Sequence, residues 1–355
     1  MNPYFAVTAL VFMVGLMFLL PLVPALLELR RKSDALPLSV VQQNAGEIRY
    51  FASSFRAYIH ELEPTIRECV DSGTTATGTL PNGEEYVVLG RADEHLMQAL
   101  GQRDARPMVI TAGVDLFMPA EATFSKDIYA GAQFVGGEKN SYRTILGDKN
   151  VHLGASSRVL RWVHAVGEFT AELGCKLLGR ISSDSLICLH GNCSFLRLNA
   201  PRIEIGRVDA IADANTQSYA VAARAGASRR ILHDGDFEIS AGEVIANDIV
   251  VRGNLRIRSG ARVCGSVKSL SELVLEDAVS IEGSLISATE MHIGPRCTIH
   301  GPVVAEREIS IATGVQCGSA EHPTTVSAPS IEIEEGVLVF GTLWARDYGQ
   351  VVAIP

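Results

Sequence analysis

The feature that most constrains this chain is an 18-residue repeat that runs from Phe237 to Leu343. Aligned at that period, the sequence gives three apolar columns and one glycine column: Phe237, Leu255, Leu273, Met291 and Ile309; Ile239, Ile257, Leu275, Ile293 and Ile311; Ile245, Val263, Ile281, Ile299 and Cys317; Gly265, Gly283 and Gly301. After an insertion of four residues near 319–327 the register resumes with Ile331, Ile333, Val339, Gly341 and Leu343. A fixed period of this size predicts a solenoid, in which each turn buries its apolar face against its neighbours.

Each repeat also has a finer pattern, which predicts β-strands. Apolar residues occur in pairs around one polar residue, as in Leu255-x-Ile257, and pairs such as Ser259-Gly260 supply corners. Because the anchor positions recur about every six residues, each turn should hold three short strands. The predicted fold is therefore all-β, a triangular β-helix with 18-residue turns stacked about 4.8 Å apart.

The same period occurs earlier in the chain, less regularly, and predicts a first solenoid block over residues 107–206. One column reads Val151, Phe169, Ile187 and Ile205, and another reads Val159, Leu177 and Phe195. Residues 207–234 break the pattern and predict a linker or excursion before the second block, residues 235–345. The period does not say whether the two blocks stack into one rod or form two.

The N-terminal region, residues 1–33, predicts a transmembrane helix. Tyr4 to Leu27 is a run of 24 residues without Asp, Glu, Lys, Arg or His, and as a helix of about 36 Å it would cross a hydrocarbon layer of about 30 Å. The alternative, a cleaved signal peptide, is disfavoured because nothing basic precedes the run and the run is long. Arg30, Arg31 and Lys32 follow directly, so the positive-inside rule places the rest of the chain in the cytoplasm.

Residues 34–106 predict a small α/β lead-in that connects the anchor to the repeats. An apolar stripe (Ile48, Phe51, Phe55, Ile59) predicts an amphipathic juxtamembrane helix over Val40–Glu63, ended by Pro64. A Thr- and Gly-rich loop at 71–83, a strand at 86–89 and a short helix at 92–100 are expected to follow.

Composition excludes several classes of function. The net charge is −9 and no basic run exceeds Arg30-Arg31-Lys32, so nucleic acid is not an expected partner. The seven cysteines include no Cys-x-x-Cys pair, which indicates free thiols in a reducing compartment. Cys188-x-His190-x-x-Cys193 lacks a fourth metal ligand. No phosphate-binding loop, nucleophile elbow or metalloprotease motif occurs, so no catalytic residue, cofactor or metal is predicted.

One stretch of the second block resembles a known family. Gly253-Asn-Leu-Arg-Ile-Arg-Ser-Gly-Ala-Arg-Val-Cys-Gly-Ser-Val, with its last element repeated at Gly283-Ser-Leu and Gly301-Pro-Val, resembles the repeat of the bactofilins, the polymer-forming cytoskeletal proteins. The resemblance covers about residues 235–345. It implies a right-handed β-helix that polymerises end to end without nucleotide beneath the bacterial inner membrane. It also implies homo-oligomers or filaments, and envelope or polysaccharide-synthesis proteins as recruited partners.

Two other functions stay open. Hexapeptide acyltransferases, which form left-handed β-helices, share the 18-residue turn, and their catalytic base would have to be one of five histidines: His152, His164, His190, His292 or His300. Those enzymes need a small residue four positions after each aliphatic one, and five of eleven such positions here are bulky. These histidines are therefore expected on the lateral surface. A monomeric adaptor that uses the lateral faces is the third possibility.

The end of the second block is the predicted site of self-association. A solenoid ends in a strand whose backbone groups lack partners, and only a short tail, residues 346–355, follows this one. Phe340 and Trp344 are expected to be the apolar anchors of this edge, together with Val339 and Leu343.

Overall fold

The protein was analysed as a computed structural model, which describes residues 10, 12–17, 19, 20, 23, 49–91, 99, 108–111, 113–207 and 230–353. The chain divides into two compact units, residues 1–47 and 48–355. In the first unit residues 12–17 are helical, and the side chains of Phe12, Met13 and Met17 are exposed. Among the described residues there is no helix of the length and apolarity needed to cross a bilayer. Most of the predicted span Tyr4–Leu27 lies outside them.

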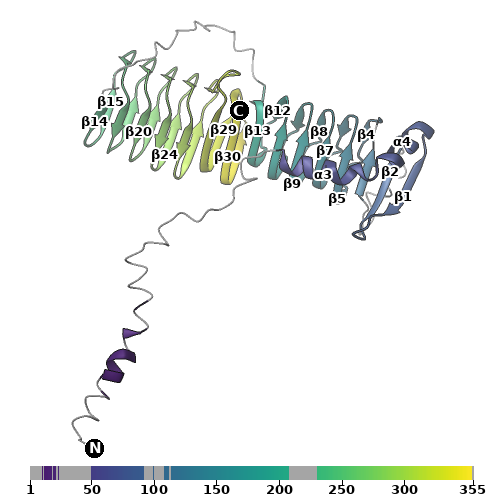
Figure 1. The fold of residues 1–355 in the computed structure, drawn as a ribbon. Coiled ribbons are helices and arrows are strands. Elements are labelled where there is room, and N and C mark those ends of the chain that lie inside the picture. The colour runs from purple at the N-terminus through teal and green to yellow at the C-terminus, as the bar shows by residue number, and fades with distance from the viewer. Residues whose placement is uncertain are drawn as a thin grey trace, which may run out of the picture. The chain divides into compact units, whose positions relative to one another are not determined.

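The second unit is mostly β and forms a solenoid of about 13 turns with few helices (Figure 1). It contains two blocks. Block 1 comprises β3 to β13: Met108–Thr111, Leu116–Phe117, Thr123–Ala130, Phe134–Val135, Ser141–Gly147, Val151–Leu153, Arg158–Ala165, Phe169–Ala171, Lys176–Ser183, Leu186–Leu189 and Ser194–Ile205. Block 2 begins with β14 to β22: Ile231–His233, Phe237–Ile239, Val244–Ile245, Ile249–Val251, Leu255–Ile257, Arg262–Val263, Val267–Ser269, Leu273–Leu275 and Ser280–Ile281. It continues with β23 to β30: Leu285–Ser287, Glu290–Ile293, Thr298–Ile299, Val303–Ala305, Glu308–Ile311, Gln316–Cys317, Thr324–Glu334 and Val337–Val352.

Each turn of block 2 contains three strands, and each strand pairs in parallel with the strand three positions later in the chain. β14 pairs with β17, β15 with β18 and β16 with β19, and the same offset continues to β28. Residues of one predicted column are direct partners, for example Leu255 with Leu273 and Ile257 with Leu275. The side chains of these four residues are buried, while that of Arg256, which lies between Leu255 and Ile257, is exposed. The solenoid predicted from the columns is thus confirmed.

The glycine column is required by the distance between successive turns. A Cβ added to Gly283 would lie 2.6 Å from the backbone of Gly265, and one added to Gly301 would lie 2.5 Å from the backbone of Gly283. Ordinary carbon contacts begin near 3.5 Å. The backbones therefore approach more closely at this corner than any other residue would permit.

Block 1 is built the same way, but its strands are longer and its core holds larger side chains. β5, β7, β9 and β11 pair in parallel, with a bulge in several pairs that lets one strand serve two faces. Its largest fully buried side chains include Tyr142, Phe134, Phe169 and Phe195. These aromatic side chains take core positions that Ile, Val and Leu occupy in block 2.

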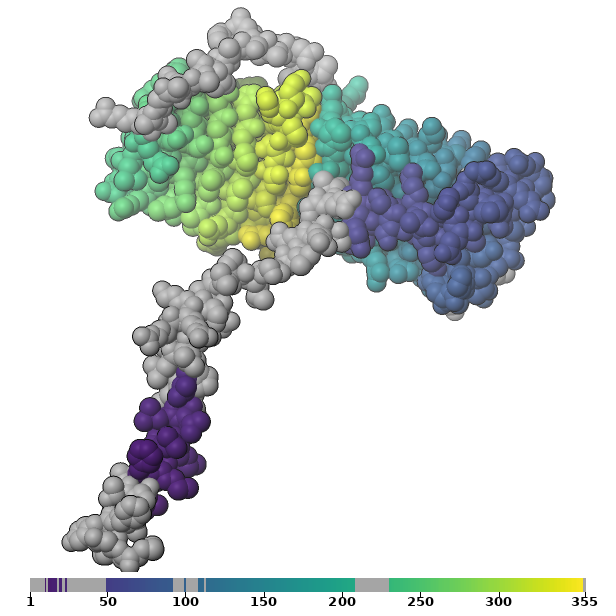
Figure 2. Space-filling model, in the orientation of Figure 1, coloured from purple at the N-terminus to yellow at the C-terminus, as the bar shows by residue number. Residues whose placement is uncertain are grey.

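Two helices and a hairpin precede block 1 and lie against it (Figure 2). Helix α3 (Tyr50–His60) packs Phe55 and Ile59 over Leu146, in a second hydrophobic cluster on the outside of the sheet. The predicted helix Val40–Glu63 is therefore shorter within the described residues, and 40–48 lie outside them. Pro64 was predicted to end a helix, but it lies in the first turn of α4 (Glu63–Ser72). There its missing N–H costs nothing.

The segment predicted as a loop, residues 71–83, is also different in the structure. It contains β1 (Thr75–Thr79), which forms an antiparallel hairpin with β2 (Glu85–Leu89), the predicted strand. β2 continues in parallel onto β3, so the hairpin extends the sheet of block 1. Residues 92–98 and 100, predicted as a helix, lie outside the described residues.

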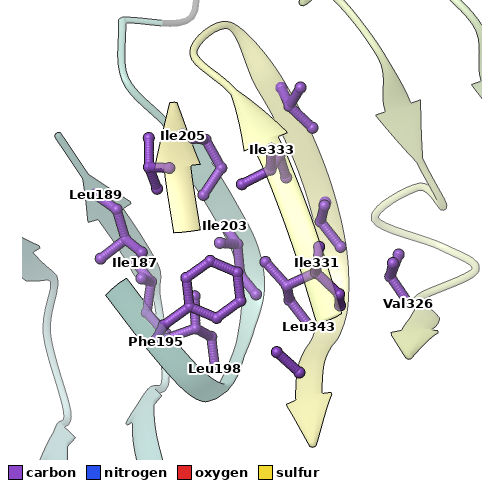
Figure 3. Packing of buried hydrophobic residues seen from close by; sticks show 14 of the residues in the cluster. Ile187, Leu189, Phe195, Leu198, Ile203, Ile205, Val326, Ile331, Ile333 and Leu343 are labelled. Carbon is purple, nitrogen blue, oxygen red and sulfur yellow. The ribbon is translucent and has the colours of Figure 1, made fainter. Parts of the chain in front are cut away.

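The two blocks meet end to end. β13, the last strand of block 1, pairs antiparallel with β30, the last strand of block 2, through nine pairs of Cα partners from Ser194–Gln350 to Ile205–Val337. Figure 3 shows the apolar side chains of both strands filling the interior at this junction, among them Phe195, Leu198 and Leu343. One hydrophobic cluster consequently runs through both blocks.

Candidate assembly surfaces

The residues predicted for self-association lie at the junction inside the chain. Val339 and Leu343 are fully buried, and their partners across the junction are Ile203 and Leu198. The segment predicted as a tail is also part of this contact, because β30 extends to Val352. The edge that was expected to be open is thus occupied by block 1 of the same chain.

Trp344 and Phe340 lie on the outer side of the same strand. Trp344 is 39% exposed, and the guanidinium of Arg197 lies over its ring at 5.0 Å from the centroid. Phe340 is partly buried and immediately precedes Gly341, whose φ of 113° turns the corner. The prediction assumed that the edge of β30 is unpaired, and this assumption is wrong because β13 pairs with it. Self-association through these four residues stays a prediction.

Three consecutive strands without a partner on one side lie at the other end of block 2. Ile231, Phe237 and Gly242 donate their N–H groups to the next turn, and no described strand lies on the other side of β14, β15 and β16. Backbone groups of successive residues in a strand point to opposite sides. Those of Leu232 and Glu238 therefore point away from the solenoid. Those of Val244 do so as well, because Glu243 and Ile245 on either side of it accept hydrogen bonds from Arg262 and Cys264 of the next turn. No described residue pairs with these outward groups.

Apolar side chains gather at this same end. Leu232 is 59% and Val244 is 67% exposed, and Ile231 and Phe237, which close the core here, are only partly buried. At the junction, by contrast, the terminal core residues of both blocks are fully buried. The edge formed by β14, β15 and β16, called the open edge below, therefore leaves the end of the core in contact with solvent.

The acidic side chains near the open edge already have partners within the chain. Asp234 pairs with Arg252 at 3.2 Å and Glu238 with Arg258 at 2.9 Å. Asp236 accepts a hydrogen bond from the backbone N–H of Asn254 at 2.7 Å. The charge at the edge is thereby partly balanced, which leaves backbone groups and apolar side chains as its main unsatisfied features.

The open edge was not predicted from the sequence, although the sequence contains a signal for it. The apolar columns begin at Phe237, Ile239 and Ile245, directly after the segment that breaks the pattern. The first member of each column has a neighbouring turn on one side only. The same reasoning led to the predicted self-association site at the last strand of block 2.

One of the five histidines is buried, contrary to the expected lateral position. His164 is 4% exposed, and its Nδ1 lies 2.9 Å from the Oγ of Ser182, which is 6% exposed. Its Nε2 lies 3.8 Å from Asp184, and Asp184 pairs with Arg49 at 2.8 Å beside the start of α3. Burial lowers the pKa of His164, and the nearby Asp184 carboxylate offsets part of that effect.

Ser182, His164 and Asp184 have the residue types of a hydrolase triad, but their positions do not suit that chemistry. A nucleophile must reach its substrate, whereas both the serine and the histidine are buried. The Ser182 hydroxyl also lies 3.3 Å from the carbonyl of Val163, to which it donates. Through Asp184 the cluster is linked to Arg49, the residue before α3.

The remaining histidines lie on the lateral faces, as expected. The Nε2 atoms of His152, His292 and His300 each lie 3.7 Å from a glutamate of a neighbouring turn, and His190 is partly buried. The seven cysteines are free, and Cys193 is buried in the core rather than placed as a ligand. Over the described residues no group of three His, Cys, Asp or Glu side chains could hold a metal ion.

Comparison of the chain with protein-family models, with curated proteins and with solved structures finds no match.

Proposed function

We propose that this protein is a non-catalytic scaffold that self-associates through its β-solenoid, is attached to a membrane, and recruits other proteins along its lateral faces. The observation that carries the proposal is the open edge, where backbone groups and apolar side chains lack a partner among the described residues. An unpaired, partly apolar strand edge readily pairs with another chain. The resemblance to the bactofilins points to the same function.

The lateral faces suit recruitment rather than catalysis. They present ladders of charged pairs between turns, for example Arg258 with both Glu238 and Glu276. Among the described residues, His164 is buried and His152, His292 and His300 each lie beside a glutamate, so no specific observation favours the acyltransferase alternative. In the bactofilin resemblance, the partners recruited along these faces would be envelope or polysaccharide-synthesis proteins.

The membrane attachment is proposed from the sequence. Tyr4–Leu27 carries no charge, and Arg30, Arg31 and Lys32 follow it. We accordingly propose a single-pass protein of the bacterial inner membrane whose solenoid, a right-handed triangular β-helix with 18-residue turns, lies in the cytoplasm. A phosphatase fused after Pro355 should be inactive in cells. Phosphatase activity from that fusion would refute this orientation.

Self-association is tested by sedimentation velocity of the full chain in detergent at micromolar concentration. More than one chain per particle is expected after the mass of detergent is subtracted. A single chain per particle over the whole concentration range would refute self-association and favour a monomeric adaptor. Turnover of an acyl-CoA by the same preparation would favour the enzyme instead.

A further inference from the structure

We propose that two copies of this chain pair through the open edge about a two-fold axis, and that the assembly closes as a dimer and does not extend into a filament. The inference rests on the proposed self-association and names its partner surface, its symmetry and its limit. The occupant of the edge is a second copy of this chain.

The junction inside the chain shows how two ends of this solenoid can fit together. β13 and β30 run antiparallel, so that the first residues of one strand meet the last residues of the other. Leu198 and Leu343, Ile203 and Val339 are then direct partners, and the core closes without exposed ends. An antiparallel contact between like ends is the geometry of a two-fold axis, in which each surface binds a copy of itself.

The same geometry can be applied to the open edge by following one outer column of the solenoid. At the junction, Trp344 of block 2 is the partner of Arg197 of block 1. The column of block 2 that ends at Trp344 therefore lies opposite the strand segment of block 1 that contains Arg197. Partner residues trace the column back through Ser327 and Val304 to Leu232 in β14. An equivalent contact at the open edge would pair β14 with β14 of the second copy, and β15 with β16.

That register agrees with the side chains present. The exposed side chain of Leu232 would lie beside its own copy, and the outward backbone groups of Glu238 would meet those of Val244. Glu238 would then lie beside an apolar residue and keep its ion pair with Arg258 at 2.9 Å. Directly opposed like charges, which destabilise a strand pair, are avoided.

The limit to two copies follows from the other ends. The last strands of both blocks are used by each other at the junction. At the beginning of block 1, β1 runs antiparallel along β2 and α4 packs against both strands. β1 pairs only with β2 and the two-residue strand β4 only with β6, so this end also has unpaired strand backbone. Its first strand, β3, is covered by β2. Among the described parts of the second unit, three consecutive strands that all lack a partner on one side occur at one end, the open edge of β14, β15 and β16. Two molecules that each have one self-complementary surface form a closed pair.

The test uses a proline on the full chain in detergent. Val244→Pro removes an N–H that points away from the ladder, and its ring blocks an incoming strand, whereas the bonds to β19 do not use that N–H. Val244→Thr is the matched control, because it keeps the N–H and the β-branched shape. We expect two chains per particle for wild type and Val244→Thr. For Val244→Pro the dissociation constant should rise about tenfold or more at an unchanged circular-dichroism spectrum.

The other outcomes overturn the inference in distinguishable ways. If Val244→Pro folds and still dimerises like wild type, the open edge is not the contact between copies. That result would leave the proposed self-associating scaffold unaffected. Wild-type filaments would refute closure at two copies while supporting self-association. A wild type that is a single chain would refute both.

Hydrogen exchange provides a second measurement that does not depend on a variant folding. The amides of Leu232, Glu238 and Val244 have no described partner within the chain, so a dimer should protect them in proportion to its concentration. Exchange that stays fast at every concentration contradicts the dimer. Protection that does not change on dilution identifies a cap from the same chain and overturns the inference equally.

Discussion

The junction between the blocks makes a quantitative prediction about Leu198 and Leu343. Both side chains are fully buried, and the two residues are Cα partners across β13 and β30. Replacing either by Ala removes buried apolar surface and leaves a cavity, which costs about 2–5 kcal/mol of unfolding free energy. Because the side chains lie against each other, the two losses should not add, and the interaction energy should be about 0.5–3 kcal/mol.

Urea unfolding of wild type, both single variants and the double variant, followed by far-ultraviolet circular dichroism, measures this interaction energy. The control pairs Leu198→Ala with Leu275→Ala, which is equally buried but lies four strand pairings from β30, about 19 Å away. That pair should be additive within about 0.5 kcal/mol. Additivity of Leu198→Ala and Leu343→Ala to the same tolerance would refute the direct contact between the blocks.

Two further predictions concern the glycine column and the buried histidine. Gly283→Ala should lower the unfolding free energy by about 1–3 kcal/mol or more, since its Cβ would lie 2.6 Å from the backbone of the preceding turn. Thermal melting should show no comparable loss of stability for the neighbouring variant Ser284→Ala. Equal losses in the two variants would contradict the close approach. Because burial lowers the pKa of His164 in the folded state, the unfolded chain binds more protons, and unfolding free energy should fall by up to about 1.4 kcal/mol per pH unit below about pH 6.5. His164→Gln should flatten that slope. An unchanged slope in His164→Gln would exclude this histidine as its source.

The solenoid could be predicted from the sequence because its core is built from repeated contacts. Each buried residue, such as Leu273, meets the same kind of neighbour in the turn before and the turn after. The same contact therefore requires a similar residue type at the same position of every turn, which gives a column at a fixed period. The glycine column is predictable for the same reason, since each close backbone approach, as at Gly283, is repeated one turn later.

Features that occur once could not be predicted in this way. Pro64 is compatible with both the end of one helix and the first turn of the next, and only the packing of α4 decides between them. The strand Thr75–Thr79 has a composition typical of loops and becomes a strand because β2 provides its partner. His164 was expected on a lateral face, but it is buried in the structure, and no repeat in the sequence signals that difference.

The predicted assembly site fails for a related reason. A column ending at Val339 and Leu343 shows that a strand edge exists, but not what lies beyond it. The partner strand begins at Ser194, and the contact joins residues as far apart in the sequence as Ser194 and Gln350. No periodic signal connects such positions, since the pairing of β13 with β30 is not repeated from turn to turn.

The end-to-end junction also explains why a long pattern-breaking segment separates the blocks. Both blocks finish at the junction, so a chain leaving Ile205 must return to the far end of block 2, at Ile231, before it can wind back toward β30. Between β14 and β30 lie six parallel strand pairings, or about 29 Å. A hairpin turn of two to five residues could not cover that distance, since an extended chain advances at most about 3.6 Å per residue. The connecting residues 206–230 exceed the minimum of about nine. The break in the 18-residue pattern is therefore the return path that joining two solenoids at their C-terminal ends requires.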